Sequence, residues 1–293
     1  MKGQSVDLAY CHVDVFSRVP FGGNSLPVFL DAPDLTEEQM QRITQELRHF
    51  EAVFTQPTGR PDTVRARIFD LFQELPFAGH PIIGAAVALH IRSESAGSHH
   101  WRFELRSKTV TVSTEMRDGH YSGWLDQGRP EFLGTVDDVG PIAHAFNLAP
   151  SDLDADLPLE AVSTGLRYLI VPVRAGVLVR ARISHDITEL LRGVNAQFAV
   201  LFDESGLEVR HWNNDGVVED VATGSAAGTI GAYRLRHGLV GGGEQFTLNQ
   251  GQYAGRSSHL HVRPEGSRND VETVNVGGDV AIVGHGVIGR PPS

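Results

Sequence analysis

The sequence contains a single cysteine, Cys11, among its 293 residues. One thiol forms no intramolecular disulfide and provides no cluster of thiolate metal ligands. The sequence also lacks an apolar run of about 20 residues, the length that a bilayer span requires. Its first residues, MKGQSVDLAYCHVDVF, are polar and then alternate, without the apolar segment of a signal peptide. We therefore expect no membrane partner and a cytoplasmic location.

Positive charge is scarce as well, because the formal net charge is −11 and no basic stripe occurs. Proteins that bind nucleic acid or anionic lipid need clustered Lys and Arg side chains, so neither partner is expected here. A hydrophobic content of 41% and a charged content of 21% are typical of a globular protein. The length favours two domains of about 150 residues each. The expected partner is a small molecule.

Two stretches of the sequence resemble each other in layout. The first is ELPFAGHPIIGAAVALH, residues 74–90, and the second is EDVATGSAAGTIGAYRLRHG, residues 219–238. In both, a glutamate stands five positions before a glycine that opens a run of small residues, and Gly224 follows Gly79 by 145 residues. Alternating β-rich segments precede them, at 65–69 and 208–212. This offset of about half the chain indicates an internal repeat.

The pattern in each half of the sequence predicts the same order of elements: two strands, a helix, two strands, a turn, a small-residue helix and further strands. The amphipathic helix of the first half is expected to start at a capping Asp34 or Thr36, and its shorter counterpart at Asp186. A helix of small residues is one that other elements surround closely. We therefore predict an α+β fold with two pseudo-symmetric domains, each a curved antiparallel or mixed sheet around a central helix.

The expected domain boundary lies in DQGRPEFLG, where Gly128 and Pro130 interrupt the pattern. The predicted domains are residues 1–127 and 128–281, and the tail at about 282–293 is a candidate to return to the first domain. If the halves are related by an approximate two-fold axis, the two small-residue helices could begin on either side of one cleft, and clefts between domains are favoured ligand sites.

His80 has two interpretations from the sequence alone. Pro81 is at home in a first helical turn, which places His80 at or next to the N-cap, where a polar side chain can simply cap the helix. A helix N-terminus also attracts an anionic substrate group, beside which an imidazole can act as an acid or base. One copy of the motif leaves both interpretations open. They are compatible, and we predict that His80 both caps the helix and lines an acid/base cleft.

Several blocks together resemble the PhzF-like isomerase family of phenazine biosynthesis, which has the diaminopimelate epimerase fold. They extend over nearly the whole chain: VDVFSRVPFGGNSLPVF, LRHFEAVF, RIFDLFQELPFAGHP, EDVATGSAAG and VNVGGDVAIVGHG. The resemblance implies that Glu51, in the second block, is the principal acid/base. It further implies that the site is completed by His80, Asp220 and Ser225. The related epimerases carry two cysteines at positions that correspond here to Ala78 and Thr223, so a two-thiol racemisation is excluded.

The predicted chemistry is a cofactor-independent isomerisation without a metal. Glu51 would move a proton, and with it a double bond, within a small cyclic acid of specialised metabolism, while His80 and Asp220 orient the substrate and relay protons. Backbone N–H groups at the helix starts would stabilise developing negative charge. The residues expected to bind substrate are Asn24, Gly79, Gly224 and Ser225.

Other interpretations remain open. One is an epimerase or racemase that uses Glu51 and a second base, and another is a non-catalytic binding or scaffold protein. A homodimer is possible. Glu74 and Glu219 are interpreted as structural residues that hydrogen-bond to the backbone near the helix starts. The histidine pairs at 99–100 and 259–261 lack a third ligand, so no metal site is expected.

Overall fold

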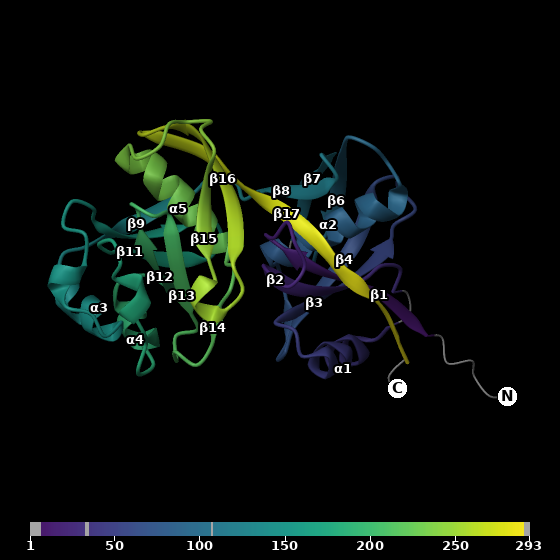
Figure 1. Cartoon of the computed structure of the whole chain (residues 1–293), viewed down its shortest axis with the longest axis horizontal. Coiled ribbons are helices and arrows are strands. Elements are labelled where there is room, and N and C mark those ends of the chain that lie inside the picture. Colours follow the sequence, from purple (N-terminus) through teal and green to yellow (C-terminus); the bar gives the residue numbers. More distant parts are fainter. Residues whose placement is uncertain (1–6, 33–34, 107, 290–293) are drawn as a thin grey trace. The chain divides into compact units, whose positions relative to one another are not determined.

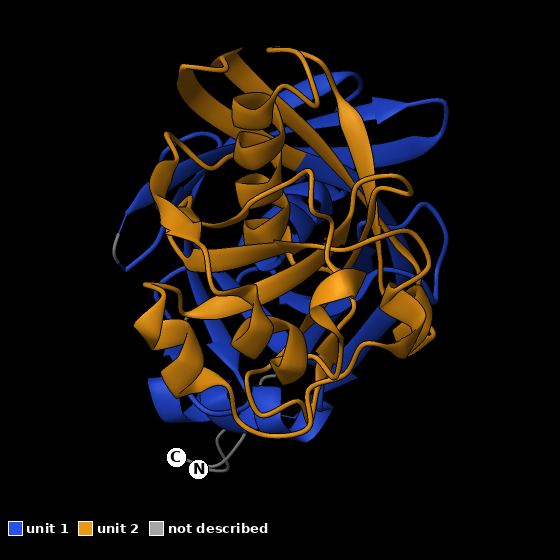
Figure 2. Ribbon diagram, turned by 90° about the vertical axis from the view of Figure 1, so that its left-hand side faces the viewer, with its two compact units in different colours: residues 1–125, 277–293 blue, residues 126–276 orange. Residues whose placement is uncertain are grey.

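The computed structural model of the chain describes residues 7–32, 35–106 and 108–289. Its contacts divide the described residues into two compact units. Unit 1 consists of those up to Leu125 and those from Gly277 onward, and unit 2 is Asp126–Val276 (Figure 2). The division lies two residues before the boundary expected at 127/128, and the chain re-enters unit 1 five residues before the expected 281/282.

Unit 1 is a curved, mixed sheet with two helices (Figure 1). Its elements are β1 (Leu8–Val15), β2 (Asn24–Phe29), α1 (Glu37–Leu47), β3 (Glu51–Pro57), β4 (Thr63–Asp70), β5 (Glu74–Leu75), α2 (Gly79–Ser93), β6 (Ser98–Glu104), β7 (Thr109–Arg117), β8 (His120–Asp126) and the last part of β17 (Asp270–Ile288). Strand β1 pairs antiparallel with β2 and with β17. Strand β2 is parallel to β3, β3 antiparallel to β4, and β4 parallel to β6. Because β17 also pairs with β8, the strands of this unit close into a circuit.

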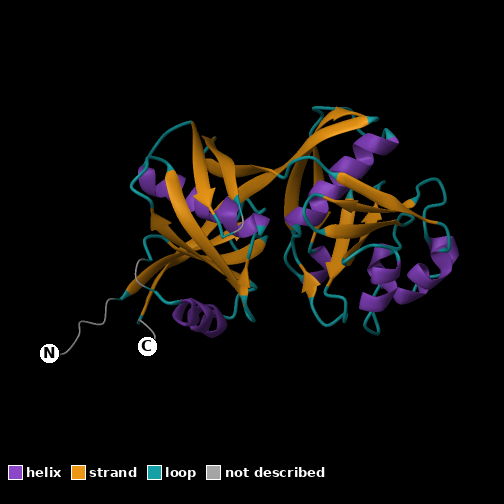
Figure 3. Ribbon diagram, turned by 180° about the vertical axis from the view of Figure 1, so that it is seen from behind, coloured by secondary structure: helices purple, strands orange, loops and turns teal. Residues whose placement is uncertain are grey.

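Helix α2 lies inside this circuit, and its small residues explain why it fits there. It contacts β1, β2, β3, β6 and β7. A Cβ atom on Gly84 would lie 2.6 Å from Leu26 Cδ2 and 2.9 Å from Val15 Cγ2, which is closer than packed atoms approach. The backbone of α2 therefore touches the surrounding strands, and the predicted central helix is confirmed (Figure 3).

Unit 2 repeats this order with extra short helices. Its elements are β9 (Glu131–Val136), α3 (Val139–Ala145), η1 (Pro150–Asp152), β10 (Leu159–Ser163), β11 (Arg167–Pro172), η2 (Leu178–Arg180), α4 (Thr188–Gly193), β12 (Phe198–Asp203), β13 (Glu208–Trp212), β14 (Glu219–Asp220), α5 (Gly224–His237), β15 (Phe246–Gln250), η3 (Gln252–Ala254), β16 (Ser258–Ser267) and the first part of β17. The pairs β10–β11, β12–β13 and β15–β16 are antiparallel, whereas β11–β12 and β13–β15 are parallel. This pattern matches that of unit 1, as the internal repeat predicted.

Helix α5 is enclosed in the same way as α2. A Cβ atom on Gly231 would lie 2.6 Å from Val262 Cγ1 and 2.8 Å from Val274 Cγ1. Thr229, Ile230, Ala232 and Tyr233 are fully buried. The two small-residue runs in the sequence thus form the central helices of the two units.

The helix starts agree only in part with the sequence predictions. Thr36 caps α1 and forms a capping box with Gln39, while Asp34 lies outside the described residues. Helix α4 begins at Thr188, and Asp186 accepts the Thr188 N–H at 2.7 Å. The prediction that His80 caps α2 is wrong, because the N-cap residue is Ala78 and no side chain caps this helix. None of the described helices has the length and apolar character needed to cross a membrane.

Candidate active site

In unit 1 the structure brings two of the predicted catalytic residues together. Glu51 is the first residue of β3, and His80 is the second residue of α2. Nε2 of His80 lies 3.2 Å from Oε2 of Glu51. The contact exists because β3 and the start of α2 lie at the same end of the unit. A carboxylate and an imidazole at this distance can exchange or share a proton.

The environment of His80 keeps its imidazole neutral. The residue is only 7% exposed, and burial lowers the pKa of His80 to about 3. Burial is the cause of this shift, because desolvation penalises the charged form of the ring. Nε2 of His80 and Oε2 of Glu51 are close but are not aligned as a hydrogen bond. His80 thus lies beside the Glu51 carboxylate as a neutral ring, while the backbone N–H groups at the start of α2 remain without a side-chain cap.

Asn24 belongs to the same unit and begins β2, next to the strand that Glu51 begins. It is 2% exposed. The preceding Gly23 has a φ of +62°, and a Cβ atom there would lie 2.3 Å from the carbonyl oxygen of Val15. Only glycine fits this close approach, so the turn before β2 is fixed by Gly23. Asn24 is held at the start of its strand, whereas its role in substrate binding stays a prediction.

In unit 2, Asp220 lies in a dense polar network. Its Oδ1 accepts the Ala222 N–H at 3.1 Å, and its Oδ2 accepts the Thr223 hydroxyl at 2.6 Å. Gln250 braces the same turn, because its amide donates to the Asp220 carbonyl and to the Thr223 hydroxyl, each at 2.9 Å. Burial raises the pKa of the Asp220 carboxyl, although these hydrogen bonds and His211 act in the opposite direction. The carboxyl is therefore poised to hold a proton more readily than a solvated aspartate.

Ser225 occupies in α5 the position that His80 occupies in α2, since each is the second helical residue. Ser225 does not cap its helix, because the N-cap residue is Thr223. The Ser225 hydroxyl shares a 2.9 Å hydrogen bond with the hydroxyl of Tyr168, which is buried. Burial raises the pKa of Tyr168, and the charge of Asp220 adds to this effect. Tyr168 is thus a neutral hydrogen-bonding group that faces both Ser225 and Asp220.

His211 completes the polar group of unit 2. Its place in β13 is opposite Asp220 in β14. Its Nδ1 lies 2.9 Å from the carbonyl oxygen of Ala199, which accepts only, so Nδ1 carries the hydrogen. Burial lowers the pKa of His211. Sequence reasoning missed His211, Tyr168 and Gln250, since their partners are distant in the sequence and no motif marks them.

The first residues of the two central helices contain no thiol. The N-cap positions are Ala78 and Thr223, as the sequence comparison with the two-cysteine epimerases indicated. Cys11 lies in β1, where burial raises the pKa of its thiol to about 11. A buried thiol with a raised pKa is a poor nucleophile and a poor base near neutral pH.

Glu74 and Glu219 are structural, but not in the predicted manner. Each is held by an arginine on the neighbouring strand rather than by the backbone. Arg67 donates to Glu74 at 2.8 and 2.6 Å, and Arg210 donates to Glu219 at 2.8 and 2.7 Å. These two-point ion pairs join β4 to β5 and β13 to β14 just before the central helices. They are twin features of the repeat.

Within residues 7–32, 35–106 and 108–289, no three His, Cys, Asp or Glu side chains gather as metal ligands would. Three of the histidines that the sequence analysis considered have other partners. His99 contacts Asp62, His259 contacts Asn249, and His261 contacts Thr247, each at 2.9 Å.

Comparison with solved structures defines the class of this fold. A structure described as a predicted epimerase from Pseudomonas aeruginosa is 43% identical, with a TM-score of 0.88 over 96% of this chain and 99% of that one. A phenazine biosynthesis protein of the PhzF family from Bacillus anthracis is 25% identical, with a TM-score of 0.84 over 96% and 99%. A hydroxyproline epimerase from Agrobacterium vitis, at 14% identity and a TM-score of 0.64, shares the fold alone. The chain thus has the fold of the PhzF proteins and the proline racemases.

The sequence comparisons narrow this class. The model of the family PhzC-PhzF, described as phenazine biosynthesis-like protein, matches residues 13–286. Trans-2,3-dihydro-3-hydroxyanthranilate isomerase from Pseudomonas chlororaphis is 32% identical over 286 residues, which cover 95% of this chain and 98% of that protein. The chain is therefore an enzyme of the isomerase class. It belongs to the PhzF family of phenazine biosynthesis-like proteins.

Proposed function

We propose that this isomerase moves a proton, and with it a double bond, within a small cyclic acid, and that Glu51 is the group that takes and returns the proton. The observation that carries the proposal is the 3.2 Å contact between Glu51 and His80 at the start of α2. Because the buried imidazole is neutral, His80 can orient the carboxylate without neutralising its charge. Glu51 then keeps its capacity as a base, and His80 acts as a positioning and hydrogen-bonding group.

The polar group of unit 2 supplies the other half of the proposed site. Asp220, with its raised pKa, would give a proton to or take one from a substrate heteroatom. Ser225, together with the N–H groups of Gly224 and the residues after it, would bind a substrate carboxylate. Gly79 and Asn24 would serve the same purpose in unit 1. We propose that both groups act on one substrate molecule, and the repeat, which gives each unit the same helix start, supports a shared role.

The substrate class follows from the relatives. The Pseudomonas chlororaphis enzyme is named for trans-2,3-dihydro-3-hydroxyanthranilate, a ring that carries a carboxylate. A carboxylate suits a helix start with free N–H groups, and a ring C–H next to a conjugated double bond is acidic enough for a carboxylate base in a shielded site. We propose a cyclic carboxylic acid of this kind as the substrate. No step of this proton transfer requires a cofactor. A cytoplasmic location and a homodimer stay predictions of the sequence.

An epimerase is the alternative, because the 43% identical structure is described as one. Epimerisation needs one base on each face of the substrate carbon. With Ala78 and Thr223 at the helix starts, the bases would be Glu51 and either His80 or Asp220 rather than two thiols. The product distinguishes the two reactions: epimerisation inverts a stereocentre, whereas the proposed isomerisation shifts a double bond and changes the ultraviolet absorbance of the ring.

The test is the substitution Glu51→Gln. The amide has nearly the shape of the carboxylate but cannot take a proton, so turnover should fall by a factor of about 10² to 10⁴ or more while the fold is kept. Glu46→Gln is the matched control, because Glu46 is an exposed glutamate on α1 of the same unit. Turnover would be followed by absorbance with cyclic dienoic acids. Full activity of Glu51→Gln rejects the proposal.

The substitution Asp220→Asn tests the role of the polar group of unit 2, and a reaction in heavy water tests the number of bases. If both halves serve one substrate, Asp220→Asn also lowers turnover, and an unchanged rate would remove unit 2 from the site. In heavy water, a shielded single base returns part of the substrate hydrogen to the product. Complete incorporation of solvent deuterium would instead favour the two-base epimerase.

A further inference from the structure

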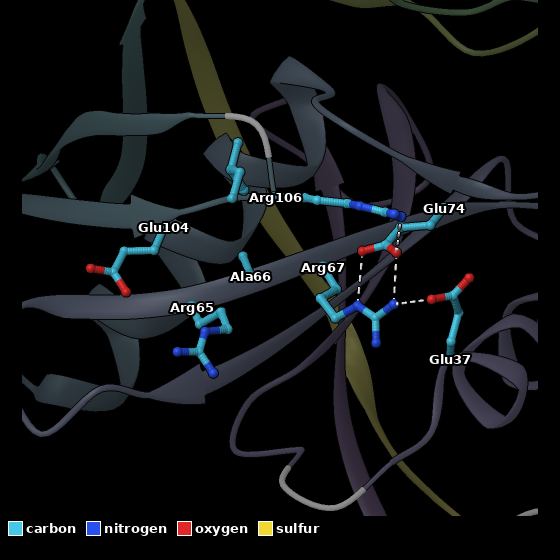
Figure 4. A pocket seen from close by; sticks show the side chains of 8 residues that line it. Glu37, Arg65, Ala66, Arg67, Glu74, Glu104 and Arg106 are labelled. Carbon is cyan, nitrogen blue, oxygen red and sulfur yellow. Dashed lines mark hydrogen bonds and ion pairs between the residues drawn. The ribbon is translucent and has the colours of Figure 1, made fainter.

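A pocket in unit 1 is lined by arginines and glutamates. It has a volume of about 410 Å³ and lies where β4 meets β6, next to the start of α1. Its charged side chains are those of Arg65, Arg67, Arg106, Glu37, Glu74 and Glu104 (Figure 4). The proposed chemistry of Glu51 and His80 uses none of them.

The pocket lies on the other face of the sheet from Glu51. In the antiparallel pair of β3 and β4, Glu51 is opposite Asp70 and Phe54 is opposite Arg67. Successive residues of a strand point to opposite faces, and directly opposed residues share a face. Phe54 is three positions from Glu51, so Arg67, and Arg65 two positions before it, project away from the Glu51 side. A ligand in this pocket would therefore occupy a place separate from the proposed active site.

The glutamates of the pocket already have cationic partners. Glu74 accepts two hydrogen bonds from Arg67, and Glu37 accepts one at 2.7 Å. Glu104 is paired with Arg60, which is outside the pocket lining. In Figure 4 the Glu74 and Glu37 carboxylates both face Arg67. Glu37 and Glu74 are thus paired with Arg67 and Arg106 of the pocket itself, and Glu104 is paired with Arg60 outside it.

The guanidinium groups, in contrast, have N–H groups to spare. Nη1 of Arg67 has no acceptor among the described residues, since its other two nitrogens serve Glu74 and Glu37. Arg106 makes one contact, to Glu74 at 3.3 Å, and its side chain is 72% exposed. Arg65 makes no side-chain hydrogen bond or ion pair in the described part of the chain. Three guanidinium groups with open donors therefore line one pocket, in a chain whose formal net charge is −11.

In unit 2, groups of the protein itself fill the equivalent place. Arg210 is the twin of Arg67, because each clamps a glutamate across the same hairpin. Nη1 of Arg210 donates to the carbonyl oxygens of Leu178 and Ala181 at 2.5 and 3.0 Å, and the ring of Tyr253 lies 4.6 Å from its guanidinium. In unit 2 the protein itself supplies oxygens to this nitrogen. In unit 1, Arg67 lines a pocket, and the same nitrogen has no acceptor among the described residues.

We propose that the pocket of Arg65, Arg67 and Arg106 binds a small polyanion whose carboxylate or phosphate oxygens take the place that the carbonyl oxygens occupy in unit 2. Guanidinium groups recognise both kinds of oxyanion through paired N–H donors. An anion with two or more charged groups can contact Arg106 and Arg67 at one end and Arg65 at the other. A monovalent anion such as chloride cannot bridge them.

The test is calorimetric titration of the whole protein, at low ionic strength, with citrate, pyrophosphate, inorganic phosphate and chloride in turn. We expect saturable binding of citrate or pyrophosphate with a Kd below about 1 mM. Binding of citrate alone assigns the pocket to polycarboxylates, and binding of pyrophosphate or phosphate alone assigns it to phosphorylated molecules. No saturable binding of any of these four anions overturns the proposal.

Variants locate the bound anion. In the double variant Arg65→Ala/Arg106→Ala the Kd for the anion should rise at least about tenfold. Each single variant should give part of this effect. Both side chains are exposed, so their removal leaves the core intact. Arg117→Ala is the control, because Arg117 is an exposed arginine of β7 outside the pocket. Glu51→Gln should bind the anion as the wild type does. Unchanged binding in the double variant, or its loss in Glu51→Gln, places the anion elsewhere and overturns the assignment.

Discussion

His80 and Glu51 form a contact in which a neutral ring faces a carboxylate, with Nε2 and Oε2 3.2 Å apart. The neutrality of the ring has a measurable consequence for stability. The pKa of His80 is lowered to about 3 in the folded protein, whereas an unfolded histidine has its ordinary value of about 6.5. Between these values the unfolded chain binds one more proton, so stability rises with pH there.

We therefore expect that His80 makes the protein lose stability as pH falls from about 6.5 towards about 3, with a slope of about 1.4 kcal/mol per pH unit from this group. In His80→Gln, which does not titrate, this part of the slope should disappear. Urea unfolding at several pH values between 7 and 4 measures it. His144→Asn, which replaces an exposed histidine of α3, should keep the wild-type slope. An unaltered slope in His80→Gln would show that the ring is not held neutral.

The role of Ser225 in substrate binding can be tested by comparing two tyrosines of unit 2, Tyr168 and Tyr233. The Tyr168 hydroxyl shares a 2.9 Å hydrogen bond with the Ser225 hydroxyl. Tyr233 lies on the later part of α5, and its hydroxyl donates to the Pro158 carbonyl at 2.8 Å. If Ser225 binds the substrate carboxylate, Tyr168→Phe removes its orienting partner. A hydrogen bond is worth about 0.5–1.5 kcal/mol, so KM should rise about two- to tenfold with kcat little changed.

Tyr233→Phe removes a hydroxyl of the same unit and should lower stability by a similar amount without a change in KM. Steady-state kinetics and urea unfolding of both variants separate the two effects. Equal KM values for Tyr168→Phe and the wild type would mean that Ser225 does not depend on Tyr168 for substrate binding.

Much of the fold could be predicted because its local signals are strong. Alternation marked the strands, and the runs of small residues marked two helices that strands must surround. The spacing from Glu74 to Gly79 and from Glu219 to Gly224 located both helix starts. The cap was predicted wrongly because proline is tolerated throughout the first turn. Pro81 is the third helical residue, so the cap falls on Ala78 rather than on His80.

The partners of the site residues were harder to predict. Tyr168 meets Ser225 across 57 residues of sequence, and His211 meets Asp220 only through the pairing of β13 with β14. Such contacts depend on packing and register, which local patterns do not encode. The partners of Glu74 and Glu219 could have been found, since an arginine occupies the same place in both repeated strands, RARIF and EVRHW.

Gly84 tests how closely α2 fits its surrounding strands. In Gly84→Ala the new Cβ would meet Leu26 and Val15, both fully buried, at 2.6 and 2.9 Å. Overpacking of this kind costs about 1–3 kcal/mol, which exceeds the gain of up to about 1 kcal/mol from better helix propensity. The measurement is urea unfolding. Gly193→Ala, in α4 with no atom within 4 Å of its Cβ, should be neutral or stabilising. A stabilised Gly84→Ala variant would show that α2 is packed more loosely.

The two arginine–glutamate pairs should differ in their contribution to stability, although they are twins in sequence. Arg210 has a side chain that is only 9% exposed and also holds the carbonyls of Leu178 and Ala181. Its removal in Arg210→Met leaves Glu219 and these oxygens without their donor, so we expect a loss of about 3–5 kcal/mol.

The Arg67 side chain is 27% exposed, and Glu74 keeps Arg106 as a second cation when Arg67 is replaced. Arg67→Met should therefore cost less, about 1–3 kcal/mol. Urea unfolding of the two variants under the same conditions gives the comparison. A larger loss for Arg67→Met than for Arg210→Met would contradict the view that unit 2 satisfies its arginine internally while unit 1 leaves donors of Arg67 open to a ligand.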